Sequence, residues 1–186
     1  KIALTRIMAF WDYILNKRHL EEGPRVKFVR FSDAYKDTSQ YDAWDKSLQA
    51  FEHESYLESI HHFLEYLNDK DLENANWWEE DGQLHFQLYQ GSKQINGVAD
   101  NQKLRCSARN AKGEQLNVGL LRRLIEHNNA LKYSRYALDS EGYITMVFDT
   151  FLLDGSPYKL YYALKEIATH SDKQDDLLII EFNLVG

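Results

Sequence analysis

The segment LHFQLYQGSKQINGVADNQKLRCSARN, residues 84–110, decides the fold. Its first part alternates apolar residues with more polar ones: Leu84, Phe86 and Leu88 against His85, Gln87 and Tyr89. A period of two residues predicts a strand with one buried face. Gly91 then marks a turn, because glycine tolerates positive φ. The pieces INGVA and KLRCSARN predict two more strands of an antiparallel meander.

The last of these three strands carries two contrasting rows of side chains. One row is apolar and the other hydrophilic: Leu104, Cys106 and Ala108 against Arg105, Ser107 and Arg109. The apolar row predicts the side that faces the core, with Cys106 as a buried structural thiol. The hydrophilic row predicts a solvent-facing side, which antiparallel sheets commonly have.

The C-terminal half continues with a helix, a hairpin and a second helix. EQLNVGLLRRLIEHNN has apolar residues at helical spacing, and we expect these to face inward: Leu116, Leu120, Leu121, Leu124 and Ile125. LKYSRYAL and YITMVFDTF flank the turn DSEG and predict two strands. Ser156 and Pro157 suit the start of the last helix. The final IIEFNLVG predicts a short strand or a tail.

The N-terminal half is helical. From Tyr41 to Asn68, apolar residues recur at helical spacing with a break near residues 52–55, which predicts two helices packed as a hairpin. The run AFEHESYLESIHHFLEYL is similar to one helical hairpin of a tetratricopeptide repeat, but such arrays need about three units. The segment 68–83 that follows is polar and predicts a connection without a strand.

This order of elements predicts an α+β fold. We expect an antiparallel sheet of about five strands in the order β-β-β-α-β-β-α, with helices on one face and an N-terminal helical hairpin before it. Residues 1–52 are expected to form a helical extension and residues 53–186 the α+β domain, together one compact unit. Residues 8–20 are amphipathic and predict a docked helix, with attachment to a membrane surface as the alternative. Met8 is a candidate native start, which would make residues 1–7 foreign.

Composition and charge argue against several classes. The chain has 186 residues and a net charge of −7 at pH 7, which disfavours nucleic acid as a partner. Residues 33–80 hold three lysines and thirteen acidic residues, which indicates a solvated face or a surface for a basic partner. No apolar run approaches the roughly 20 residues of a membrane-spanning helix. The single cysteine excludes an intramolecular disulfide and is typical of the cytoplasm, where we expect the protein.

Two stretches carry a resemblance to a known family. In LLRRLIEHNNALKYSRYALDSEGYITMVFDTFLLDG, a leucine-rich helix ending in asparagine leads to a hairpin with an acidic–glycine turn. In YYALKEIATHSDKQDDLL, a long helix carries a small residue before Asp172. Over residues 57–180 the chain resembles the type III secretion chaperone-like superfamily, which includes the bacterial YbjN-type domains. The resemblance implies a small acidic protein, often a homodimer, that binds other polypeptides without catalysis, although the N-terminal extension departs from the compact family pattern.

The candidate binding residues are basic and aromatic: Arg105, Arg109, Tyr133, Arg135 and Tyr136. Such residues also occur on the sheets of RNA-binding domains, but the acidic chain favours a protein partner. We therefore expect a non-enzymatic protein-binding module, chaperone-like or regulatory. Its sheet would receive a polypeptide partner or a second copy of the chain.

The alternative hypothesis is a metal-dependent enzyme. HESYLESIHH contains Glu58 and His61 as a Glu-x-x-His motif with His62 beside them, and one such motif supplies two ligands from one helix. A di-metal bundle needs a second motif, and the sequence contains none, so we expect a polar helix surface here and no cofactor. A third hypothesis is a regulatory module whose dimeric state changes when a ligand binds.

Overall fold

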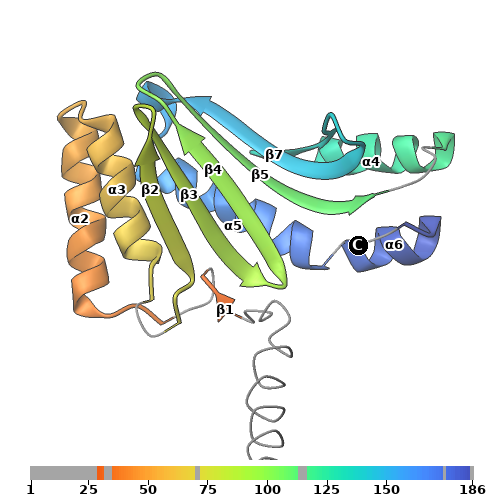
Figure 1. Ribbon diagram of the computed structural model, residues 1–186, viewed down its shortest axis with the longest axis horizontal. Coiled ribbons are helices and arrows are strands. Elements are labelled where there is room, and N and C mark those ends of the chain that lie inside the picture. The colour runs from red at the N-terminus through yellow and green to blue at the C-terminus, as the bar shows by residue number, and fades with distance from the viewer. Residues whose placement is uncertain (1–28, 32–34, 70–71, 113–116, 174, 185–186) are drawn as a thin grey trace, which may run out of the picture.

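The computed structural model describes residues 29–31, 35–69, 72–112, 117–173 and 175–184. They form one antiparallel sheet with helices on one side and at one end (Figure 1). The strands are β1 (Val29–Arg30), β2 (Ala75–Glu80), β3 (Gln83–Gly91), β4 (Lys93–Ala99), β5 (Lys103–Lys112), β6 (Arg135–Leu138) and β7 (Tyr143–Phe151). The helices are α2 (Thr38–Glu52), α3 (Tyr56–Leu67), α4 (Val118–Ala130), the 3-10 turn η1 (Leu152–Asp154), α5 (Pro157–Lys173) and α6 (Asp175–Phe182).

The strand order is β1-β3-β4-β5-β7-β6, and β2 also pairs with β3. Every pairing between described strands is antiparallel. The predicted α+β class is therefore confirmed. The five predicted strands are present, and β1 and β2 bring the number among the described residues to seven.

Strand β2 corrects the prediction that residues 68–83 are only a connection. It pairs along its whole length with β3. Asp81 and Gly82 form the turn between the two strands, and both have positive φ, 51° and 74°, as a type I′ turn requires. An Asp-Gly pair is a sequence signal for this turn. The strand was hard to recognise because its inward residues are few, Ala75 being buried and Trp77 half-buried.

The predicted N-terminal hairpin is confirmed, with α2 and α3 side by side next to β2 (Figure 1). Two buried serines join the helices. Ser47 Oγ donates to the Ser59 carbonyl at 2.7 Å, and Ser59 Oγ donates to the Ser47 carbonyl at 2.8 Å. The predicted boundary after residue 52 falls in the turn between the helices, and the division into extension and domain stays a prediction. The expected helix over residues 8–20 lies outside the described residues.

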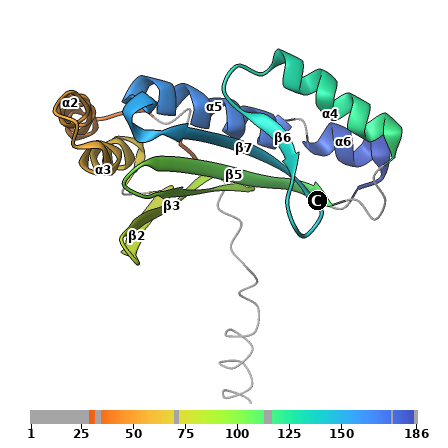
Figure 2. The ribbon, with the colours of Figure 1, turned by 90° about the horizontal axis from the view of Figure 1, so that it is seen from above.

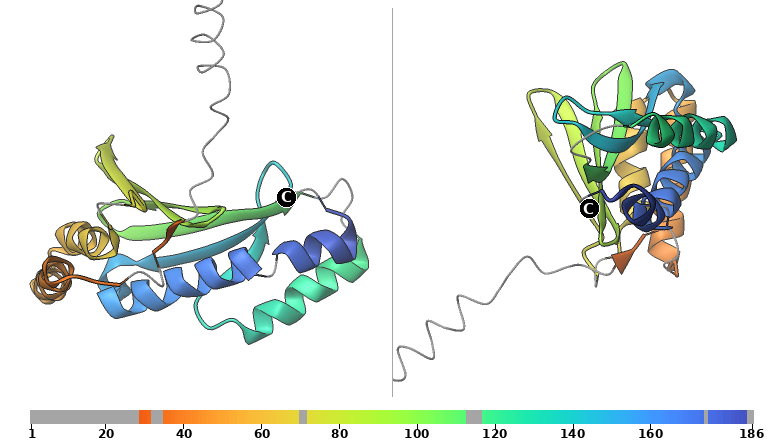
Figure 3. Two further views of the ribbon diagram at one scale, coloured as in Figure 1. Left: turned by 90° about the horizontal axis from the view of Figure 1, so that it is seen from below. Right: turned by 90° about the vertical axis from the view of Figure 1, so that its right-hand side faces the viewer.

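Helices α4, α5 and α6 cover one face of the sheet, as Figures 2 and 3 show. The inner side chains of α5 are at most 2% exposed: Leu160, Leu164, Ile167 and Ser171. Helix α6 replaces the strand or tail predicted at the C-terminus. In α4, Leu120 and Leu124 are buried as predicted, but Leu121 and Ile125 are 38% and 69% exposed. These two side chains are exposed because α4 packs on the sheet through one narrow side. Leu116, which was also expected to face inward, lies outside the described residues.

The helix-facing side of the sheet belongs to one apolar core. On β5, Leu104, Cys106 and Ala108 are at most 1% exposed, as predicted. Burial raises the pKa of the Cys106 thiol far above its ordinary value, which is expected of a structural rather than a reactive cysteine. On β4, a Cβ atom at Gly97 would lie 2.0 Å from the Phe86 ring, so only glycine fits beneath that ring.

Candidate functional site: the open face of the sheet

The face of the sheet opposite α4, α5 and α6 has no described helix over it (Figures 2 and 3). We call this surface the open face. Two of its aromatic residues are strongly exposed, Trp78 on β2 at 41% and Phe151 on β7 at 51%. The Trp78 ring stacks on His85 of β3 with centroids 5.5 Å apart, and Lys103 Nζ lies 5.1 Å from the Phe151 ring centroid. Aromatic and basic groups therefore share this surface.

Three of the five candidate binding residues lie on the open face. Arg105 and Arg109 project outward from β5, and Arg135 projects outward from β6. Tyr136 does not, because it alternates with Arg135 along β6 and is only 6% exposed, within the core. The Asn128 side chain bonds both the N–H and the carbonyl of Tyr136, at 2.6 and 3.2 Å. The helix α4 thus protects this stretch of the sheet edge.

Tyr133 is also absent from the open face, because β6 begins later than predicted. The loop before β6 is held by Glu166 of α5, whose carboxylate accepts the backbone N–H groups of Lys132, Tyr133 and Ser134 at 2.8–3.0 Å. Burial alone would raise the pKa of Glu166, but these hydrogen bonds outweigh it and lower the pKa below its ordinary value. The Tyr133 ring consequently stacks on Tyr162 of α5, on the helical side.

A groove of about 340 Å³ crosses the open face over β5, β7 and β6. We call it the arginine groove; the residues that matter most in its lining are Arg105, Ser107, Arg109, Ala137, Thr145 and Val147. Its floor is buried, with Val147 at 3% and Thr145 at 4% exposed, although both side chains point away from the helices. In the strand register, Val147 lies between Ser107 of β5 and Arg135 of β6. Neighbouring strands shield this floor.

The three arginines of the open face differ in their partners. Arg109 Nε lies 2.7 Å from Asp139, and its Nη2 lies 2.7 Å from Glu141. Arg135 forms an ion pair with Asp149. The Arg105 side chain forms no ion pair or hydrogen bond with any residue that the structure describes. Its opposite neighbour on β7 is Asp149, the carboxylate that bonds Arg135 instead.

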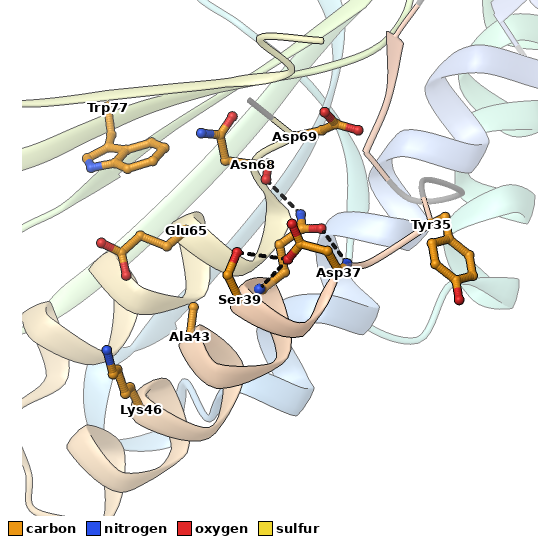
Figure 4. A pocket seen from close by; sticks show the side chains of 10 residues that line it. Tyr35, Asp37, Ser39, Ala43, Lys46, Glu65, Asn68, Asp69 and Trp77 are labelled. Carbon is orange, nitrogen blue, oxygen red and sulfur yellow. Dashed lines mark hydrogen bonds between the residues drawn. The ribbon is translucent and has the colours of Figure 1, made fainter. Parts of the chain in front are cut away.

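A larger cavity, about 720 Å³, lies between the start of α2, the end of α3 and β2 (Figure 4). The polar groups at the start of α2 bond one another and the end of α3. Asp37 Oδ1 accepts the Gln40 N–H and the Ser39 hydroxyl, both at 2.8 Å. Gln40 Nε2 donates to the Asn68 carbonyl at 2.7 Å and to the Tyr66 carbonyl at 3.0 Å. Only Asn68 Oδ1 is buried there without a partner among the described residues.

Lys36 adds a cation at the end of α3, beside this cavity. Its Nζ donates to the Leu67 carbonyl at 3.1 Å and lies 5.1 Å from the Tyr66 ring centroid. Burial lowers the pKa of the Lys36 amine to about 8, although Asp69 and Asp37 act in the opposite direction. A cation at a helix C-terminus stabilises the last carbonyls. The polar groups here organise the hairpin itself.

The metal cluster of the alternative hypothesis is not assembled. His62 Nδ1 lies 2.8 Å from Glu65, and its Nε2 lies 4.0 Å from Glu58. His61 turns toward β2, where its Nε2 lies 3.7 Å from Glu79. Successive helix positions differ by roughly 100° around the axis, so the two histidines face different neighbours. Within the described part of the chain, no three His, Cys, Asp or Glu side chains converge to hold an ion.

Sequence reasoning did not include Trp78 or the groove floor among the candidate residues. Trp78 was missed because its strand was taken for a connection. For Val147 a signal existed, since Ile144, Met146 and Phe148 were expected to face the core and Val147 must then face outward. Its burial depends on which strands flank β7, and this information is not local in sequence.

The fold is an antiparallel sheet with helices on one face and a second, open face. We compared the sequence and this fold with those of known proteins. No protein-family model matches the sequence, and no curated protein matches it either. The structure is similar to the Yersinia pestis type III secretion chaperone SycH in complex with a stable fragment of YscM2. The identity is 14%, the match covers 69% of this chain and 97% of that chain, and the TM-score is 0.42.

Two further solved structures are similar. One is a chain of the ExsC–ExsE complex, with 13% identity, 56% of this chain and 75% of that chain covered, and a TM-score of 0.40. The other belongs to the heterodimeric ExoU–SpcU complex from the type III secretion system of Pseudomonas aeruginosa. There the identity is 10%, the coverage 59% and 86%, and the TM-score 0.34.

SycH is a type III secretion chaperone, the class that the sequence resemblance named, and at 10–14% identity the three likenesses concern the fold alone. At such TM-scores they carry no argument about what this chain binds, and the YbjN-type assignment stays a prediction. In the described residues, no helix is both long enough and apolar enough to span a membrane.

Proposed function

We propose that the chain is a non-enzymatic, chaperone-like or regulatory module that binds a polypeptide partner on its open face. The observation that carries this proposal is an uncovered sheet face with exposed aromatic and arginine side chains. Trp78 and Phe151 are 41% and 51% exposed, and Arg105 lies between them on β5. Tryptophan, tyrosine and arginine are the residue types that most often dominate protein interfaces.

The make-up of the open face also supports this function. The face offers polar groups at the edge of a half-buried apolar surface, which is the usual anatomy of a protein interface. We place the role in the cytoplasm, because the sequence has a single cysteine, Cys106, and so no intramolecular disulfide.

Site-specific photo-crosslinking in the cells from which the chain comes tests the proposal. Benzoylphenylalanine at Val98, on β4 in the middle of the open face, should give a discrete crosslinked product that contains a polypeptide. The matched control places the same group at Glu126, exposed on α4. Crosslinks at Glu126 but not at Val98, or at neither position, would overturn the proposal.

A further inference from the structure

The arginine groove has chemistry that points to a particular kind of partner residue. We infer that it receives an acidic side chain, Asp or Glu, of an extended partner segment, with Arg105 as the anchoring residue. This inference rests on the proposed function and names the partner chemistry of the same surface.

The first step is the charge of the groove. Arg109 and Arg135 are neutralised by carboxylates of the chain itself, Asp139 and Glu141 for the former and Asp149 for the latter. Arg105 is left as the cation without a bonded partner among the described residues. A carboxylate from outside therefore meets an attractive charge and displaces no ion pair that the structure describes. A basic residue would be repelled by Arg105 itself, although the three arginines and these three carboxylates together carry no net charge.

The second step is hydrogen-bonding geometry. A guanidinium presents several N–H donors in a planar fork that matches a carboxylate with two parallel hydrogen bonds. Beside Arg105 lie the Ser107 hydroxyl on β5 and the Asn96 amide, and Asn96 and Ser107 are direct neighbours in the register of β4 and β5. These two polar groups can bond the backbone of a bound segment. The groove thus complements an acidic residue together with its own peptide groups.

The third step is the apolar floor. Val147 and Ala137 lie beneath the rim of polar side chains; Ala137 is opposite Thr145, which is two residues from Val147 along β7. In an extended segment, alternate side chains point to the same side. A partner segment can therefore place an acidic residue against Arg105 and a small apolar residue over Val147. Burial of the apolar residue supplies affinity, whereas the arginine supplies selectivity.

Selection of random twelve-residue peptides displayed on phage tests this inference. Peptides are selected on the wild-type chain and counter-selected on Arg105→Gln, so that only peptides dependent on Arg105 remain. We expect these peptides to contain Asp or Glu next to a small apolar residue. In synthetic copies, replacing the acidic residue by its amide should weaken binding about tenfold, a difference of about 1.4 kcal/mol.

A matched control is Arg123→Gln on α4, where Arg123 is about as exposed as Arg109 and lies 3.9 Å from Glu181. This variant should bind the selected peptides as the wild type does. Circular dichroism and melting temperature establish that both variants are folded. Recovery of basic peptides, or of no peptide that depends on Arg105, would overturn the inference.

Two outcomes separate this inference from the proposed function. A polypeptide crosslinked at Val98 together with selected peptides that lack acidic residues would retain the binding module and reject the acidic anchor. An Arg105→Gln variant whose sedimentation shows loss of a dimer would assign the groove to a second copy of the chain, again against the inference. Tighter binding of a single-stranded oligonucleotide than of acidic peptides, lost in Arg105→Gln, would reject both proposals.

Discussion

The cavity beside the helical hairpin and the arginine groove on the sheet both contain cations, but these cations have different surroundings. Lys36 at the hairpin is largely buried, bonds the Leu67 carbonyl and lies against the Tyr66 ring. Arg105 in the groove is exposed, and its side chain bonds no residue that the structure describes. A cationic side chain that is hydrogen-bonded within the chain contributes to the stability of the fold, whereas an exposed one without a bonded partner is available to another molecule. Changes at the hairpin should therefore alter stability, and changes at Arg105 should alter binding alone.

The largest expected effect on stability lies at the hairpin, at Gln40. This side chain is 8% exposed and bonds the carbonyls of Tyr66 and Asn68. Gln40→Ala leaves these carbonyls with fewer partners and removes part of the cap of α2, so we expect a loss of about 2–3 kcal/mol in the free energy of unfolding. Urea denaturation measures it. Gln49→Ala, at an exposed position of the same helix, is the control and should cost under about 0.5 kcal/mol.

A smaller effect should follow from Lys36 and should depend on pH. The pKa of Lys36 is about 8 in the folded chain, and a lysine in an unfolded chain has a pKa of about 10.4. Between these values the unfolded chain binds more protons, so stability should rise with pH from about 8 to 10. Since the amine is only partly shielded from solvent, we expect about 1 kcal/mol instead of the full value.

The measurement is the free energy of unfolding of the wild type minus that of Lys36→Met, from pH 7 to 10. The difference should move in favour of the wild type as pH rises. Lys46→Met, at an exposed lysine of the same cavity, should leave the slope unchanged. A flat difference for Lys36→Met would mean that this cation is no more constrained by the fold than Arg105 is.

The smallest effects are expected on the open face, where Arg109 and Arg105 provide an internal contrast on one strand. Arg109→Gln removes two ion pairs and the contact with the Tyr143 ring. It should lower the melting temperature slightly at low salt, and less at high salt because salt screens exposed charges. Arg105→Gln should change stability by less than about 0.5 kcal/mol. If Arg105→Gln proved more destabilising than Arg109→Gln, the inference that Arg105 serves binding and not stability would be wrong.

The sequence predicted the strands best where alternation was long and regular. In β3 and β5, the residues expected to face inward are the buried ones. The predicted hairpin turn before Tyr143 is also present, and there Asp139 accepts two backbone N–H groups. The prediction failed at β2 because only two of its residues face inward. It also failed at the end of the chain, since a short apolar segment is compatible with a helix or a strand. There the tertiary contacts of α6 select the helix.

For the candidate site, the sequence placed Arg105, Arg109 and Arg135 on a common solvent-facing side, and the structure agrees. The expected sheet face also included Tyr133 and Tyr136, which the structure places away from this side. Tyr136 failed because the expected strand was assigned no inward side, and Tyr133 failed because Glu166, more than thirty residues away, holds its loop. A hydrogen bond to a distant helix leaves no periodic trace in the local sequence.

By itself, the sequence determined which side of each long strand is buried, because side-chain direction alternates with a period of two whatever the strand's neighbours are. Only the tertiary structure decided which arginine lacks a bonded partner. β7 lies between β5 and β6, and the register places Asp149 opposite Arg105. Arg135, from the far side of β7, forms the ion pair with Asp149. Pairing among three strands depends on their order and register, and residues far apart in the chain set both.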